Sequence, residues 1–308
     1  MKFKLLPISV ITLSLVLTFT ACKKDTSVAG NNDYSTELSA QSDDQEQVSA
    51  EVDAVADDAN AAVSSESSMS GRVLADICDA TIEADTTGDI KKLTITYDGL
   101  NCHGNRKRTG VVVLSMPKSV HWKDAGATLT ISIQNLKITR LRDNKSIIIN
   151  GTKTITNVTG GLLKDLASRQ IITHTISSDG LTITFDNATQ RSWKIALQRS
   201  FTYDNGIVIT TTGTHTEGTS TGIAVWGTNR SGNAFTCTIS LPLIVRQDCD
   251  FRLVSGEIIH ARPAITATTT FGLDASGVPT SCPGTGTYYF KLVWVGANGN
   301  SHTIIWPY

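Results

Sequence analysis

From Cys78 onward, apolar and polar residues alternate in short segments separated by turn residues. Residues 93–97 and 129–133 alternate with a period of two, which puts the apolar side chains on one face of a β-strand. Asn-Gly, Asp-Gly and Ser-Gly pairs between such segments are typical of hairpin turns. We therefore predict an all-β body of antiparallel sheets, arranged as a sandwich or a barrel-like sheet. The other predicted strands are 146–150, 171–176, 181–185, 207–211, 236–241, 251–254, 288–295 and 303–306.

Two details of this pattern bear on the architecture of the body. A turn at Ser178-Asp179-Gly180 is expected to separate strands 171–176 and 181–185, and 161–170 has room for one short helix. The order Cys-Asp, strand, strand, aromatic-Gly, Cys occurs at 78–102 and again at 249–282, and segment 130–151 resembles 238–256. These echoes leave open an internal duplication into two similar halves.

The first 22 residues form a separate pattern. Lys2 and Lys4 precede an apolar run that ends at Phe19, and this run is shorter than the ~20 residues that span a bilayer. It therefore predicts a signal peptide over 1–21. The end of the run, Phe19-Thr20-Ala21-Cys22, resembles a bacterial lipobox, with Phe19 where leucine is usual. That resemblance implies that Cys22 begins the mature chain and carries acyl chains such as palmitate.

Residues 22–72 have the composition of a tether. There is no Lys or Arg between 25 and 71, and ten acidic residues lie between 31 and 68. Such a segment is expected to be disordered or partly helical and to act as a spacer, in preference to an acidic partner-binding segment. Val48, Val52, Val55 and Val63 are spaced for a short amphipathic helix over 46–63, which would be marginal by itself.

Charge separates this tether from the body. The 308 residues carry a net charge of −1, but residues 72–308 hold 23 Lys and Arg against 17 Asp and Glu. The near-zero net charge argues against a nucleic-acid partner, and the positive charges of the body are scattered. Their one run, Arg106-Lys107-Arg108, is expected in a solvated hairpin connection.

From Cys22 onward, the chain resembles uncharacterised all-β lipoproteins of Bacteroidota. This resemblance implies a location at the outer membrane and an all-β fold, and it brings no catalytic motif. The residues that carry it are Cys22-Lys23-Lys24-Asp25, the acidic segment, Thr96-Tyr97-Asp98-Gly99 through Cys102, the stretch 106–112, and Cys249, Gly256 and Cys282.

Catalytic motifs are weak in this sequence. Gly218-Thr219-Ser220-Thr221-Gly222 matches the nucleophile elbow, but a strand rather than a helix is expected after it. Ser115-Met116-Pro117-Lys118 matches S-x-x-K, but Pro117 opposes the helical turn that this motif needs. The six His show no metal-ligand spacing. Asp186, Asp204, Glu217 and Glu257 are the acids considered for glycoside cleavage, and each fits a turn or surface position.

Thr and Trp suggest binding more than catalysis. Repeated Thr-x-Thr triplets put Thr on one sheet face, as expected for the polar side of an amphipathic sheet. Trp122, Trp193, Trp226, Trp294 and Trp306 are expected mainly in the core or at its rim, although exposed ones could stack on sugars.

The cysteines are predicted to form two disulfides. With Cys22 acylated, five Cys remain, and the repeated Cys-Asp order favours Cys78–Cys102 and Cys249–Cys282. Cys237 then stays unpaired on a buried strand face, with Cys237–Cys249 as the competing pair.

These expectations combine into a three-part chain: a signal peptide (1–21), a lipidated tether (22–72) and a β domain (73–308). We expect a non-enzymatic interaction module on the outer membrane, without cofactor or metal. Its partners would be the membrane, through the lipid, and a glycan or another envelope protein. A carbohydrate-binding or glycan-active protein and a lipid-handling protein are the alternatives.

Overall fold

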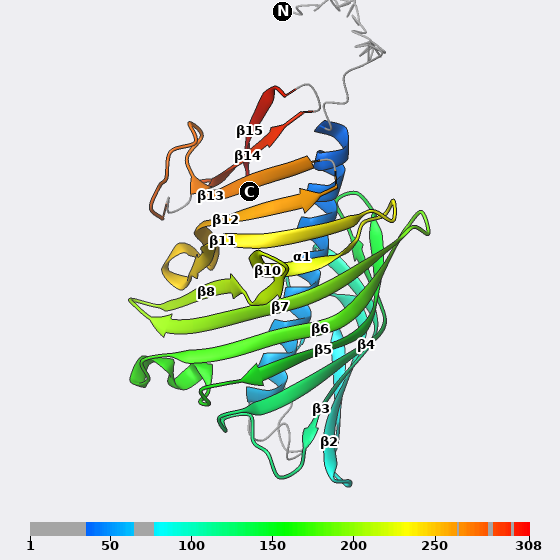
Figure 1. The fold of residues 1–308 in the computed structure, drawn as a ribbon. Helices are drawn as coiled ribbons and strands as arrows, with labels where there is room; N and C mark the ends of the chain where they lie inside the picture. Colours follow the sequence, from blue (N-terminus) through cyan, green and yellow to red (C-terminus); the bar gives the residue numbers. More distant parts are fainter. Residues whose placement is uncertain (1–34, 65–76, 264, 283–285, 297–298) are drawn as a thin grey trace, which may run out of the picture. The chain divides into compact units, whose positions relative to one another are not determined.

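The computed structural model describes residues 35–64, 77–263, 265–282, 286–296 and 299–308, and residues 32–308 belong to one compact unit. This unit combines one long helix with a single antiparallel sheet of 15 strands (Figure 1). The helix is α1 (Ser35–Ser64). The strands are β1 (Ala80–Asp85), β2 (Ile90–Leu100), β3 (Arg106–Pro117), β4 (Ala127–Arg140), β5 (Ser146–Asn157), β6 (Ile172–Phe185), β7 (Gln190–Tyr203), β8 (Ile207–Gly213), β9 (His215–Glu217), β10 (Ser220–Thr228), β11 (Ala234–Arg246), β12 (Arg252–Arg262), β13 (Ile265–Leu273), β14 (Tyr289–Val295) and β15 (Ser301–Pro307).

The sheet is close to a simple meander. Strands β1 to β7 follow one another, β10 pairs with β7, and β11 to β15 continue the series. The short strand β8 pairs with β7 and β11, and β9 pairs with β10. In the described connections lie the 3₁₀ helices η2 (Leu163–Ser168), within the segment expected to hold a short helix, and η3 (Gln247–Cys249). The all-β, antiparallel, barrel-like prediction is confirmed.

Glycines and bulges let the long strands bend. The pairing of β3 with β4 and of β5 with β6 shifts register once along each pair. Gly110 sits at the first shift and Gly151 just before the second, with φ of 130° and 131°, and an added Cβ would lie 2.5 Å and 2.8 Å from backbone of the neighbouring strand. Only glycine tolerates this conformation and this close approach together. The bends give the sheet a concave and a convex face.

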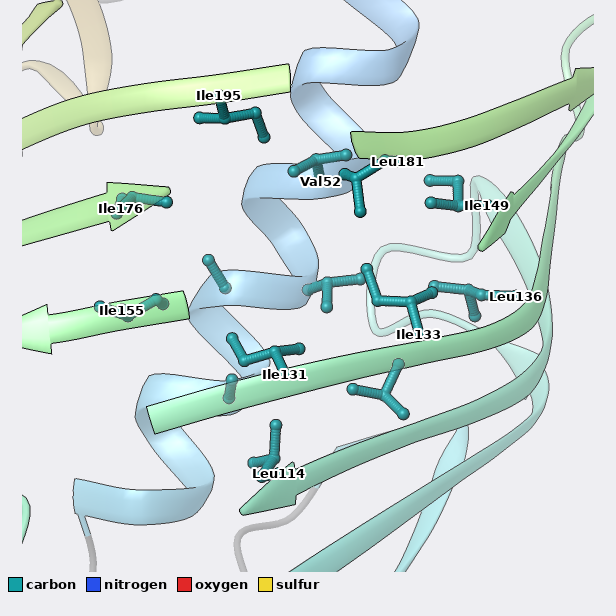
Figure 2. Close-up of a cluster of buried hydrophobic side chains, with 14 of the residues drawn as sticks. Val52, Leu114, Ile131, Ile133, Leu136, Ile149, Ile155, Ile176, Leu181 and Ile195 are labelled. Carbon is teal, nitrogen blue, oxygen red and sulfur yellow. The ribbon is translucent and has the colours of Figure 1, made fainter. Parts of the chain in front are cut away.

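The two faces differ as the alternation predicted. Leu93 and Ile95 on β2, and Ile131 on β4, are fully buried, whereas Thr94 and Thr130 between such residues are half-buried on the other face. The buried positions line the concave face, where Figure 2 shows them gathered around α1. The Thr residues lie on the convex face, so the predicted polar side of the sheet is its outer side.

Helix α1 occupies the concave face. Ser35–Ser64 has no Pro or Gly, and its Val and Ala residues recur at three- and four-residue spacing. Val48, Val55, Ala59 and Val63 are at most 2% exposed and belong to the same core cluster as the sheet residues. A helix was expected at 46–63 within a partly helical acidic segment, and the structure shows a longer one, Ser35–Ser64, packed against the sheet. Packing against the sheet supplies the stability that such a helix lacks by itself.

Two expectations need correction. The segments 171–176 and 181–185 form one strand, β6, because Ser178-Asp179-Gly180 is a bulge rather than a turn. The basic run does not form a solvated connection, since it opens β3 and Arg108 is only 6% exposed. The two echoed segments, 78–102 and 249–282, each enclose a pair of adjacent strands of the one continuous sheet, β1–β2 and β12–β13.

Candidate functional site

The densest group of buried charged residues lies between α1 and the concave face of the sheet. Four acidic side chains of the helix each meet an arginine of the sheet or its turns. Because strands and a turn far apart in the sequence supply the arginines, only the folded sheet brings these partners together. The pairs are Asp44–Arg230, Glu51–Arg106, Asp53–Arg199 and Asp58–Arg108.

Arg108 is the centre of this interface. Its Nε and Nη2 each lie 2.6 Å from a carboxylate oxygen of Asp79, and its Nη1 lies 2.7 Å from Asp58. Tyr97 donates its hydroxyl to the same Asp58 at 2.8 Å, and the guanidinium lies over the Tyr97 ring. Burial raises the pKa of Tyr97 well above its ordinary value, so this hydroxyl stays a donor. The cluster therefore fixes the helix to β2 and β3.

Lys153 of β5 reaches the helix backbone. Its ammonium donates to the carbonyl of Val52 at 3.0 Å, and the residue is 1% exposed. Burial lowers the pKa of Lys153 to about 8, while the nearby charges of Asp53 and Asp57 act in the opposite direction. A carbonyl inside an intact helix already accepts one backbone hydrogen bond, and its second lone pair can accept another. Lys153 thus adds a polar contact without breaking the helix.

A row of three polar residues crosses neighbouring strands beside this contact. Asn157 on β5 stands opposite His174 on β6, and His174 stands opposite Arg199 on β7. Within the described part of the chain, Asn157 Oδ1, His174 Nε2 and Arg199 Nε are buried without a hydrogen-bond partner. Asn157 Nδ2 donates to the carbonyls of Trp122 and Gly161, which fixes the orientation of its amide. Buried polar atoms of this kind typically bind an ordered water.

His174 is suited to hydrogen bonding rather than proton transfer. Its ring packs edge-on between Trp122 and Phe201, with ring centroids 5.2 Å and 5.0 Å away. Burial, and to a smaller extent Arg199, lowers the pKa of His174 to about 4. A general base works best when its pKa is near the working pH. The neutral imidazole therefore packs between the two aromatic rings and leaves Nε2 available for an ordered water.

A separate buried contact joins Cys237 to a histidine. Its sulfur lies 3.2 Å from Nδ1 of His260 on the next strand. Burial raises the pKa of Cys237 to about 12 and lowers that of His260 to about 4. Both groups are therefore neutral at pH 7, and the sulfur is a thiol rather than the reactive thiolate. Cys237 is the free, buried cysteine expected from the sequence.

The other cysteines lie as the sequence indicated. Cys78 joins Cys102 with Cα atoms 5.2 Å apart, and Cys249 joins Cys282 with Cα atoms 5.3 Å apart. The carboxylate of Asp248 lies close to the second disulfide, and these three residues form the one potential metal-ligand cluster in the described residues. With its two sulfurs bonded to each other, this cluster does not offer thiolate ligands. Cys22, the predicted lipidation site, lies outside the described residues.

The weak catalytic motifs do not assemble into an active centre. Gly218 has φ of 59° and turns the chain between β9 and β10, so the G-x-S-x-G match is a hairpin turn instead of a strand-to-helix elbow. Ser115-Met116-Pro117 ends β3 as extended chain. Asp204 pairs with Arg246, and Glu257 accepts hydrogen bonds from Ser240 and Thr270. Asp186 accepts a hydrogen bond from the backbone of Asn187, and Glu217 ends β9.

The tryptophans are divided as expected. Trp122, Trp193 and Trp294 are at most 5% exposed, Trp226 is half-buried and stacks on His215, and Trp306 is 51% exposed. Trp306, on β15, is thus the one in the described residues that offers most of its ring to solvent.

Sequence reasoning missed the helix–sheet ion pairs. One signal was present: Asp44, Glu51 and Asp58 recur every seven residues, which places them on one side of a helix. The acidic segment and the basic body were also complementary in charge. The identity of the arginine partners, however, depends on strand positions that no local pattern contains.

The described part of the chain includes no helix that is long and apolar enough to cross a membrane. Comparisons with protein-family models, with curated proteins and with solved structures gave no match to this chain.

Proposed function

We propose that the protein is a lipid-anchored outer-membrane protein whose β body is a non-enzymatic interaction module held close to the membrane. The observation that carries this proposal is the position of α1 inside the sheet. If Cys22 carries the lipid, only residues 23–34 separate the anchor from the first residue of the helix. Fully extended, such a segment reaches about 45 Å. The tether is then much shorter than the acidic composition indicated.

The ion pairs of the body favour a binding role over a catalytic one. The acidic residues of the helix–sheet interface are engaged with arginines that hold α1 in place. The convex face offers Thr130 and Thr154, which stand opposite each other on β4 and β5, as part of a broad polar surface. Two disulfides fit the oxidising conditions of the envelope. A stapled body with a filled concave side would present its convex side and its ends to partners.

The two alternatives make different demands on this structure. A glycan-binding role would rely on exposed aromatic rings, of which Trp306 is the most favourable. A lipid-handling role would need α1 to leave the concave face, because Val48, Val52 and Val55 already cover its apolar residues. Because that step would break several ion pairs between α1 and the sheet, the geometry favours the interaction module over the lipid-handling role.

Substitution of the anchor residue tests the proposal. Cys22→Ser should leave an unprocessed precursor without acyl label, while the wild-type chain is labelled and sediments with outer membranes. Lys23→Ser, next to the same site, is the matched control and should be processed normally. Normal maturation and membrane association of Cys22→Ser would contradict the anchoring.

A glycan array, followed by analysis of any bound sugar, tests whether the protein binds a glycan without cleaving it. We expect a bound glycan, if found, to be recovered unchanged. Cleaved sugar would instead support the glycan-active alternative, and loss of binding in Trp306→Ala with retention in Trp226→Ala would place the sugar at β15.

A further inference from the structure

The two end strands of the sheet differ in how they are protected. The series of paired strands ends at β1 on one side and at β15 on the other. An end strand presents unpaired backbone groups, which usually need charged side chains or irregular geometry to prevent association. Strand β1 carries Glu83 and Asp85. Strand β15 has no charged residue, and none occurs anywhere in 292–308.

The hydrogen bonds of β14 and β15 show which backbone groups face outward. Tyr308 donates its N–H to the carbonyl of Tyr288, and Gly296 donates to Asn300. Because antiparallel pairs alternate, the even-numbered residues of β15 bond to β14 and the odd-numbered ones point away. The outward N–H and C=O groups of Ser301, Thr303 and Ile305 have no partner in the part of the chain that the structure describes.

The side chains of β15 add an apolar strip beside this edge. His302, Ile304 and Trp306 share the face of Trp294, on which His302 stacks at 5.1 Å between ring centroids. Ile304 packs against the small core cluster of β13 and β14, whereas Trp306 remains 51% exposed. An exposed, uncharged and apolar edge strand is the type that pairs with another strand.

We propose that two copies of this chain associate by pairing their β15 strands antiparallel, around a two-fold axis at Ile304. In this register Thr303 exchanges backbone hydrogen bonds with the partner's Ile305, and Ser301 donates to the carbonyl of the partner's Pro307. Ile304 then faces the partner's Ile304, and Trp306 faces the partner's His302, which covers the exposed indole. Pro307 has no N–H to contribute, and this register asks it only for its carbonyl.

Charge and symmetry favour a second copy as the occupant. Two uncharged strands meet without the repulsion that Glu83 and Asp85 would cause between two β1 edges. The contact uses the same strand on both chains, so it closes after two copies and does not continue into a fibre. The proposal does not depend on the lipid anchor.

Two proline substitutions separate this contact from general effects on the sheet. Thr303→Pro removes an outward N–H of β15 and leaves the bonds to β14 intact. Ala84→Pro does the same on β1, where Asp98 donates to Asp79 and the even-numbered residues therefore face outward. For the full chain in mild detergent, light scattering should give a dimer for wild type and Ala84→Pro. Thr303→Pro should dimerise about 10- to 100-fold more weakly, since two symmetric bonds are lost.

Cysteine cross-linking tests the register. In the proposed pairing, the two Ile304 Cα atoms lie about 4.5 Å apart, within the range for a disulfide. Ile304→Cys should therefore form a covalent dimer on oxidation, and Thr303→Cys should not, because each Thr303 stands opposite the partner's Ile305. A monomeric wild-type chain, equal dimerisation of the two proline variants, or cross-linking of Thr303→Cys in preference to Ile304→Cys would overturn the proposal.

Discussion

At the scale of single residues, buried charge is the main feature of this protein. Arg108 is 6% exposed, and its partner Asp79 has a fully buried side chain. A buried ion pair contributes little by itself, but removing one partner leaves an uncompensated charge. The arginine therefore matters mainly because Asp79 and Asp58 depend on it.

We predict that Arg108→Ala lowers the free energy of unfolding by about 3–5 kcal/mol, because Asp79 is left buried without its counter-charge. Urea denaturation measures this loss. Lys107→Ala, at the neighbouring exposed position, should change the free energy of unfolding by less than about 0.5 kcal/mol. Equal, small effects of the two substitutions would show that the Arg108 cluster does not hold the fold.

His174 makes stability depend on pH in the acidic range. Its pKa of about 4 in the folded state is below its unfolded value of ~6.5, so the unfolded chain takes up the proton first as the pH falls. The protein should lose about 3 kcal/mol of stability through this group between pH 6.5 and pH 4. His174→Gln should remove this part of the pH dependence in urea titrations, and exposed His103→Gln should keep it. An unchanged dependence in His174→Gln would contradict the assignment.

At the scale of elements, α1 is the part whose role the fold changes most. As an isolated segment, its thin apolar stripe and acidic composition favour a solvated chain. In the structure its small residues fit against the concave face, with Ala59 and Ala62 at 0% exposure. Small side chains let the helix approach the sheet closely, while its acids reach the arginines at the sides.

We predict that 35–64 resists proteolysis in the native protein, contrary to the behaviour of a tether. Trypsin has no site in 25–71, which has no Lys or Arg, so a protease that cleaves after Glu and Asp is the suitable probe. Ala59→Glu should release the helix and expose it to cleavage, because the buried site has no room or partner for a carboxylate. The same substitution at exposed Ala61 is the matched control and should leave it protected. Rapid cleavage within 35–64 of the wild type would contradict the packing.

At the scale of the whole molecule, two disulfides each join the segments that flank a pair of adjacent strands. Cys78–Cys102 spans 24 residues around β1 and β2, and Cys249–Cys282 spans 33 residues around β12 and β13. Each closes a loop that would otherwise be free in the unfolded chain. Both bridges belong to the single sheet: the first lies at its end strand β1, and the second lies beside β12 and β13, toward the other end.

The double variant Cys78→Ser/Cys102→Ser should be less stable by about 3–4 kcal/mol in the chain-entropy model. Both cysteines are exposed, so the serine side chains themselves cost little. Guanidinium denaturation without reductant measures the difference, and reduction of the wild type should lower its stability further because both bridges open. No difference between wild type and the double variant would argue against this bridge in solution.

The sequence by itself determined the class of fold, most strand positions, the faces of the strands and the two cysteine pairs. Alternation of Leu93, Thr94 and Ile95 is a local property, because neighbouring side chains of a strand point to opposite faces. The same local rule indicated that Cys237 is buried. It failed at Ser178-Asp179-Gly180, where a bulge and a turn have the same composition, and only pairing with β5 and β7 distinguishes them.

Only the tertiary structure decided what the acidic segment does and how the basic residues are used. Asp44 and Arg230 are 186 positions apart, and Val52 and Lys153 are 101 positions apart. No local pattern contains such a pairing, since it depends on the curvature of the sheet and on which strands lie beside the helix. The spacing of Val and Ala thus predicted a helix within α1, but the concave face of the sheet made it part of the core.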